Sequence, residues 1–126
     1  MICHFVVDPP GAEIFVIRAH RALNLLTTQP GCLGGELGRS PDDITRWVLV
    51  LRFDSVVSYR RALSPFEVRE HVVPLLSEAL TSQSGGYEVL ATAQHGAVTD
   101  HASLLATDRD RMTPRESERG PGSCAR

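Results

Sequence analysis

The most constraining feature of the sequence is the run Trp47–Leu51, in which every position is apolar. A strand on a half-solvated sheet alternates apolar and polar side chains, so a run without alternation indicates a strand that is covered on both faces. In a chain this short, helices can cover one face. We therefore expect helices on one side of this strand and a second copy of the chain, in a homodimer, on the other.

The hydrophobic periodicity around this run switches between the strand and the helix period and predicts an α+β fold. In chain order the expected elements are a strand at 2–7, a helix at 12–26, strands at 32–39 and 46–53, helices at 56–63 and 66–80, and a strand at 87–97. This β-α-β-β-α-β order is typical of a ferredoxin-like plait, an antiparallel sheet with its helices on one face.

Turn and cap residues support these boundaries. Pro30-Gly31 ends the first helix, and Ser64 with Glu67 forms the pattern of a capping box at the start of the last helical segment. Pro74 is expected to kink or break that segment. The glycines of 31–38 precede a strand instead of a helix, so they indicate a bulge or close backbone approach and not a phosphate-binding loop.

The composition changes near Val98. The segment from Thr99 to Arg126 is rich in charged residues, proline and glycine and has no aromatic residue. Such a segment cannot bury enough apolar surface to offset its ordering entropy. We therefore predict a folded domain at 1–97 and a flexible tail at 98–126. A domain of that size buries roughly 60–65% of its unfolded surface, so a dimer partner would stabilise it.

The composition also excludes several classes of function. All 13 positive side chains are arginine, which excludes the lysine-dependent Schiff-base, pyridoxal-phosphate and P-loop chemistries. A net charge of −2 gives no indication of a nucleic-acid partner. No apolar run is long enough to span a membrane, and Asp8–Pro10 interrupts the start too early for a signal peptide. Three scattered cysteines indicate reduced thiols in a cytoplasm.

Three residues are candidates for catalysis. His71 falls on the inner stripe of the last helical segment, where an imidazole could act as a base near neutral pH, although a core histidine or one at the stripe's edge fits equally well. Tyr59 could donate a phenolic hydrogen bond, and Arg69 could pair with an anionic oxygen; core packing and a solvated helix face are their alternatives. The histidines have no ligand-like spacing, so we expect no metal.

One face of the strand at 46–53 offers a hydrophobic surface. If that face is directed toward the helices, it forms with the inner stripe a pocket for a flat apolar ligand; otherwise it is the dimer seam. The expected pocket residues are Trp47, Leu49, Leu51, Phe53, Val68 and Val72.

The segments Pro30–Arg39, Arg46–Val50 and Ser64–Glu67 resemble the antibiotic biosynthesis monooxygenase (ABM) family. The resemblance covers roughly residues 1–95 and implies a dimeric α/β barrel of ferredoxin-like subunits. Members include cofactor-independent oxygenases that convert polyketide anthrones to quinones, and a haem-degrading branch.

Carried over residue by residue, the resemblance matches Tyr59 with a pocket tyrosine and Arg69 with a helix arginine of the anthrone oxygenases. His71 is similar in position to the histidine of the haem-degrading branch. The oxygenases carry asparagine and tryptophan where this chain has Leu49 and Phe53. The haem-degrading branch uses the same tryptophan.

Together these observations predict a small cofactor-independent monooxygenase-like enzyme of secondary metabolism. It would act on an aromatic polyketide-type substrate, with molecular oxygen as co-substrate and no cofactor. His71 would be the base, with Tyr59 and Arg69 stabilising a phenolate or enolate. Three alternatives stay open: a polyketide cyclase or isomerase that does not oxidise, a non-catalytic module that binds a hydrophobic ligand or a protein partner, and haem degradation.

Overall fold

The computed structural model describes residues 1–103, which form two compact units. The first unit is Met1–Tyr87, and the second begins at Glu88. The domain boundary predicted after residue 97 stays a prediction, and the predicted flexible tail lies outside the described residues from position 104 onward. No described helix is long and apolar enough to cross a membrane.

The first unit contains a three-stranded antiparallel sheet in the order β1-β3-β2. Its strands are β1 (Ile2–Val6), β2 (Cys32–Arg39) and β3 (Arg46–Phe53). The apolar run therefore lies on the central strand, where Leu49 pairs with Cys3 on one side and Leu37 on the other. The β2–β3 hairpin turn is held by the Ser40 hydroxyl, which accepts from the backbone N–H of Asp42 and of Asp43.

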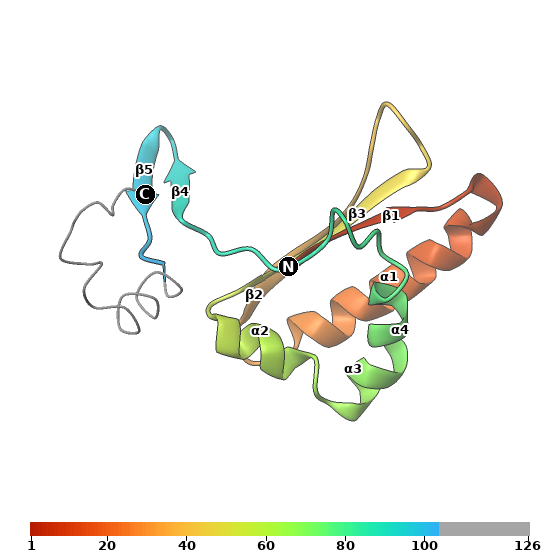
Figure 1. Ribbon diagram of the computed structural model, residues 1–126, viewed down its shortest axis with the longest axis horizontal. Helices are drawn as coiled ribbons and strands as arrows, with labels where there is room; N and C mark the ends of the chain where they lie inside the picture. The colour runs from red at the N-terminus through yellow and green to blue at the C-terminus, as the bar shows by residue number, and fades with distance from the viewer. Residues whose placement is uncertain (104–126) are drawn as a thin grey trace. The chain divides into compact units, whose positions relative to one another are not determined.

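All helices of this unit lie on one side of the sheet (Figure 1). They are the 3-10 turn η1 (Pro9–Gly11) and the helices α1 (Ala12–Thr27), α2 (Val56–Ala62), α3 (Phe66–His71) and α4 (Val73–Leu76). The buried stripe of α1, which is Phe15, Ala19, Ala22 and Leu26, has the helical spacing that the sequence predicts. The break between α3 and α4 occurs beside Pro74, as expected.

The α+β class and the antiparallel sheet with helices are confirmed. Trp47, Leu49 and Leu51 are directed toward the helices, whereas Val48 and Val50 lie on the opposite face. The three helix-facing residues are buried and the other two are half-buried. The helical cover predicted for one face of this strand is therefore present within the first unit.

Two expectations about local structure are wrong. The strand expected at 87–97 is observed only at Ala91–Gln94 (β4), and it does not join the three-stranded sheet. It pairs instead with β5 (Ala97–Asp100) in a hairpin of the second unit. Beside β1 the first unit has instead one isolated bridge, Ile2 to Gly85. Ser64 is not the cap of α3: its hydroxyl donates to the Arg61 carbonyl at 2.8 Å, and Pro65 takes the N-cap position.

The glycines of β2 have the packing role that the sequence predicts. The β2–β3 register shifts between Cys32 and Gly34, as in a bulge. A Cβ at Gly35 would lie 2.9 Å from the Val50 carbonyl oxygen. Gly31 has φ +86°, and a Cβ there would overlap the Ser58 side chain and lie 2.8 Å from Asp54 Oδ1. Because Ser58 lies in the first turn of α2, Gly31 lets the start of β2 approach that helix.

We expect Gly31→Ala to lower the free energy of unfolding by about 2–4 kcal/mol. The cost combines a left-handed backbone for a residue with a Cβ and an overlap with Ser58. Urea unfolding followed by circular dichroism measures it. Gly85→Ala is the matched control, since nothing lies within 4 Å of its Cβ position, and it should change stability by less than about 0.5 kcal/mol. Equal effects would contradict the close approach at Gly31.

Candidate functional site

Most of the expected pocket residues form the hydrophobic core of the first unit. Leu49, Leu51, Val68 and Val72 are fully or almost fully buried, together with Leu26 and Leu75. Their side chains fill the space between the sheet and the helices. Among the described residues, this part of the expected pocket is packed protein.

The two aromatic residues of the same strand lie toward its ends. Trp47 packs against Phe15, with ring centroids 5.3 Å apart, and the Arg39 guanidinium lies over its ring at 5.1 Å. Phe53, at the other end, is half-buried and pairs with Tyr59 at a centroid distance of 5.7 Å. The strand therefore presents one aromatic cluster at each end, with aliphatic core between them.

His71 lies at the edge of the helical stripe, facing α1. The Arg21 guanidinium Nη1 is 3.1 Å from its Nδ1, and Glu70 Oε1 is 3.6 Å from its Nε2. Arginine is always a donor, so Nδ1 is the acceptor and the neutral ring carries its proton on Nε2. The lone pair that a general base would use is thus engaged by Arg21. His71 can accept a proton at Nδ1 only when Arg21 moves away.

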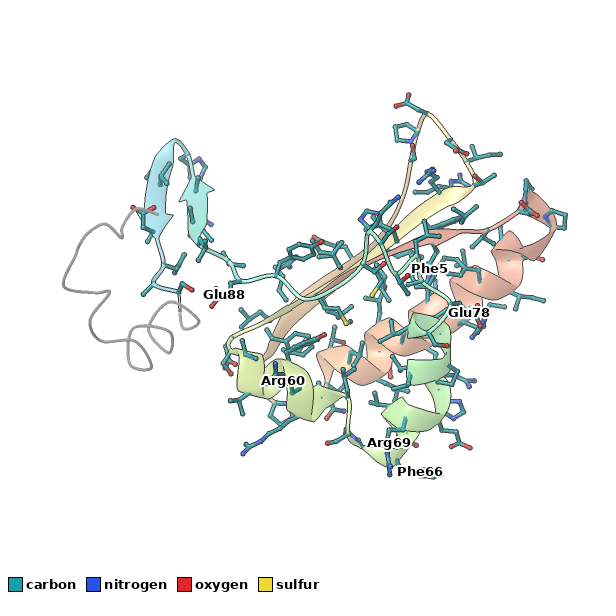
Figure 2. All side chains as sticks on the ribbon, in the orientation of Figure 1. Phe5, Arg60, Phe66, Arg69, Glu78 and Glu88 are labelled. Carbon is teal, nitrogen blue, oxygen red and sulfur yellow. The ribbon has the colours of Figure 1, made fainter. Side chains whose placement is uncertain are left out.

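The other two catalytic candidates have separate surroundings. Tyr59 is half-buried beside Phe53, and the backbone of Gly86 approaches its ring. Arg69 is exposed and lies with Phe66 on the side of α3 away from the sheet (Figure 2). The structure gives His71, Tyr59 and Arg69 no shared hydrogen bond within the described residues.

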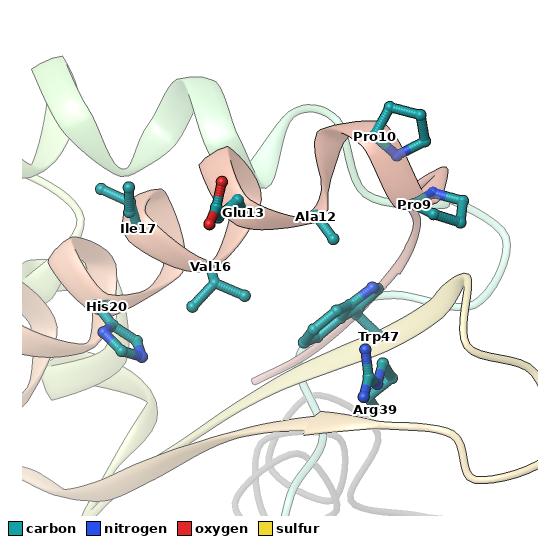
Figure 3. A pocket seen from close by; sticks show the side chains of 9 residues that line it. All are labelled: Pro9, Pro10, Ala12, Glu13, Val16, Ile17, His20, Arg39 and Trp47. Carbon is teal, nitrogen blue, oxygen red and sulfur yellow. The ribbon is translucent and has the colours of Figure 1, made fainter.

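Two open grooves lie along α1. One, of about 730 Å³, runs between α1 and α3 and is lined by His20, Arg21, Asn24, Leu25, Glu67 and His71. The other, of about 530 Å³, lies between the first half of α1 and the sheet (Figure 3). We name it the Trp47 groove; it is lined by Pro9, Pro10, Ala12, Glu13, Val16, Ile17, His20, Arg39 and Trp47.

Sequence reasoning missed Arg21 and Arg39. Arg39 had a detectable signal, because the β2–β3 hairpin register places it directly opposite Trp47. Arg21 had none, since its contact with His71 joins two helices that are 50 residues apart in the sequence.

The described cysteines and acidic residues do not form a metal cluster. No group of three or more histidine, cysteine, aspartate or glutamate side chains in residues 1–103 is arranged to hold a metal ion. Burial raises the pKa of the Cys3 thiol, and the nearby N-terminal ammonium only partly opposes this. Cys3 is therefore protonated at neutral pH and is a poor nucleophile.

Comparison with solved structures identifies the fold. One similar structure is that of SnoaB from Streptomyces nogalater, a cofactor-independent oxygenase. It matches at 24% identity and TM-score 0.53, over 62% of this chain and 78% of that one. A Nitrosomonas europaea protein provisionally assigned as an antibiotic biosynthesis monooxygenase matches at 20% identity and TM-score 0.51, over 58% and 73% of the two chains.

Rv0793 from Mycobacterium tuberculosis matches at 19% identity and TM-score 0.54, over 82% of this chain and 91% of its own. No protein-family profile and no curated protein sequence matches the chain. The fold is thus the ferredoxin-like one of the antibiotic biosynthesis monooxygenase structures, as the sequence resemblance implies.

Proposed function

We propose that this chain is a small cofactor-independent monooxygenase-like enzyme that acts in the cytoplasm on an aromatic, polyketide-type substrate. The observation that carries the proposal is the fold shared with SnoaB, at 24% identity over 78% of that oxygenase. The absence of lysine is compatible with it, because this reaction needs no amine: a histidine can act as the base, and a phenol or an arginine can stabilise the anion.

The reaction would be the oxidation of an activated ring methylene to a carbonyl. A base removes one methylene proton, and the resulting carbanion passes electrons to O₂ and forms a C–O bond. Loss of water then leaves the ketone, so that R₂CH₂ and O₂ give R₂CO and H₂O. The substrate supplies all four electrons, and the protein supplies a base, a dry surface and hydrogen bonds to the anionic oxygen.

Tyr59 is the residue best suited to this reaction. Its phenol is half-buried against Phe53, where it can donate to an oxygen whose charge grows during proton removal. His71 is the proposed base, and Arg21 would have to release Nδ1 on substrate binding. Arg69 lies on an exposed helix face, so it would contact only a substrate group that extends to the surface of the protein.

We expect oxygen uptake when the protein is mixed with an anthrone. Tyr59→Phe should lower kcat by about 10–100-fold, because one hydrogen bond to a developing anion is lost. His71→Ala should lower it by about 100-fold or more. An oxygen electrode and the absorbance of the quinone product measure both effects.

Tyr87→Phe is the matched control, since the only other tyrosine is exposed in the described chain, and its kcat should equal that of the wild type. Unchanged turnover in both site variants would remove the proposed mechanism. Product formation without oxygen uptake would favour the cyclase or isomerase instead.

A second candidate function is a non-catalytic module that binds a hydrophobic ligand or a protein partner. Two observations favour it: the space lined by Leu49, Leu51, Val68 and Val72 is packed, and Arg21 occupies the His71 lone pair. Under this function an anthrone would bind without being converted. Equilibrium dialysis of the anthrone without oxygen, beside the uptake assay, separates binding from turnover.

We also propose that the chain forms a homodimer through the sheet face opposite the helices. This far face has an apolar centre and is defined by Ile2, His4, Val6, Val48 and Val50. A salt bridge of 2.9 Å between Arg52 and Glu36 lies beside it. An apolar centre with a polar rim is the usual anatomy of a subunit interface.

A further inference from the structure

We propose that the Trp47 groove is a binding site for a small aromatic carboxylate, separate from the oxidation proposed above. The site lies at the end of the sheet where α1 begins (Figure 3). Three features converge there: a buried donor without an acceptor, an arginine without a carboxylate partner, and an apolar wall. The inference does not depend on the oxygenase activity, because its readout is binding alone.

The donor is the indole N–H of Trp47. The residue is 9% exposed, and Nε1, which is itself buried, has no hydrogen-bond partner among residues 1–103. Buried donors in folded proteins nearly always have a partner, so one without a partner is a specific feature of this groove. Figure 3 shows the nitrogen edge of the indole turned toward Pro9 and Pro10, which line the same groove. Because Nε1 is itself covered in this structure, an acceptor completes the hydrogen bond only when the neighbouring side chains, such as these prolines, shift to admit it.

The charge at this end of the groove is positive. The guanidinium of Arg39 lies over the indole ring, 5.1 Å from its centroid. No carboxylate in the described part of the chain is within ion-pair distance of it, as is also the case for Arg21, Arg60, Arg61 and Arg69. What distinguishes Arg39 is its place over the indole ring. The helix α1 also starts here, but the backbone N–H groups of Gly11 and Ala12 donate within the preceding turn and Glu13 lies in the first turn of the helix, so Arg39 carries the attraction for an anion.

The groove selects a carboxylate with an apolar body. A carboxylate has two acceptor oxygens, which match one donor on Arg39 and one on Trp47. Val16 and Ile17 of α1 form an apolar wall beside this end, and a volume of about 530 Å³ admits a one- or two-ring molecule. Glu13 lies on the same wall and repels any anion, a dianion more strongly than a monoanion, so the proposed ligand is a monoanion.

The test uses benzoate as the probe, with benzamide as its neutral counterpart. Trp47 is the only tryptophan, so its indole N–H gives one proton–nitrogen NMR signal that reports directly from the groove. We expect benzoate to move this signal downfield in a saturable way, with Kd of about 0.1–1 mM because the groove is open. Benzamide should bind about tenfold more weakly or not at all.

Two substitutions separate this site from general attraction of an anion. Arg39→Gln should weaken benzoate binding about tenfold or more, whereas Arg52→Gln, on the neighbouring strand and the other sheet face, should leave it unchanged. Glu13→Gln should strengthen binding about two- to fivefold by removing a like charge. The remaining amide signals check that each variant is folded. A non-saturable shift, equal affinity for benzamide, or equal effects of the two arginine substitutions would overturn the proposal.

Discussion

Leu49→Ala should lower the free energy of unfolding by about 2–5 kcal/mol, enough to threaten the fold of a domain this small. The side chain is 0% exposed on the central strand of the sheet. Truncation removes the favourable free energy of burying the apolar side chain. It also leaves a cavity that the neighbouring strands and helices fill only in part. Urea denaturation monitored by Trp47 fluorescence and circular dichroism gives the value.

The same substitution distinguishes core from pocket. A residue that lines an open substrate pocket contacts solvent on one side, so its truncation costs little stability. Ile14→Ala on the outer face of α1 is the control, because Ile14 is 65% exposed and lies outside the proposed dimer face, and it should cost less than about 1.5 kcal/mol. If Leu49→Ala lowers the free energy of unfolding by less than about 1.5 kcal/mol, Leu49 lines a cavity and is a pocket residue after all.

Much of the fold could be predicted because the signals for it are local. The bounds of β2 and β3, the end of α1 before Pro30 and the break at Pro74 each follow from residues within a few positions. The strand expected at 87–97 could not be placed correctly, because its apolar residues suit either a sheet edge or a separate hairpin. Which of these forms depends on tertiary pairing, which periodicity does not encode.

The candidate site was less predictable, because it depends on how elements meet. The residues buried on the last helical segment are Val68, Val72 and Leu75, and their mean direction lies roughly 60–70° around the helix from His71. His71 follows Val68 by three residues, and this spacing predicted that it lies on the inner face of the helix. In the structure it lies at the edge of that face, where it contacts Arg21. The face of β3 directed at the helices was left open by the sequence, since both of its faces are apolar.

Val48→Glu should convert the proposed homodimer to monomers. In a two-fold symmetric interface each substitution occurs twice, so the dimer would bury two carboxylates without partners. At about 3 kcal/mol per unpaired charge, the dissociation constant would rise about 10⁴-fold or more. The isolated subunit should tolerate the change, because Val48 is only half-buried in one chain. Sedimentation velocity over a range of protein concentrations measures the distribution between dimer and monomer.

The matched control is Ile14→Glu on the outer face of α1. Ile14 is 65% exposed, and it tests whether the chain associates through its helices instead of its sheet. If Ile14→Glu dissociates the protein and Val48→Glu does not, the sheet-face dimer is wrong and the apolar residues opposite the helices need another cover. If only Val48→Glu dissociates the protein, the apolar run at Trp47–Leu51 is explained on both faces of the strand. The helices then bury one face and the second copy of the chain buries the other.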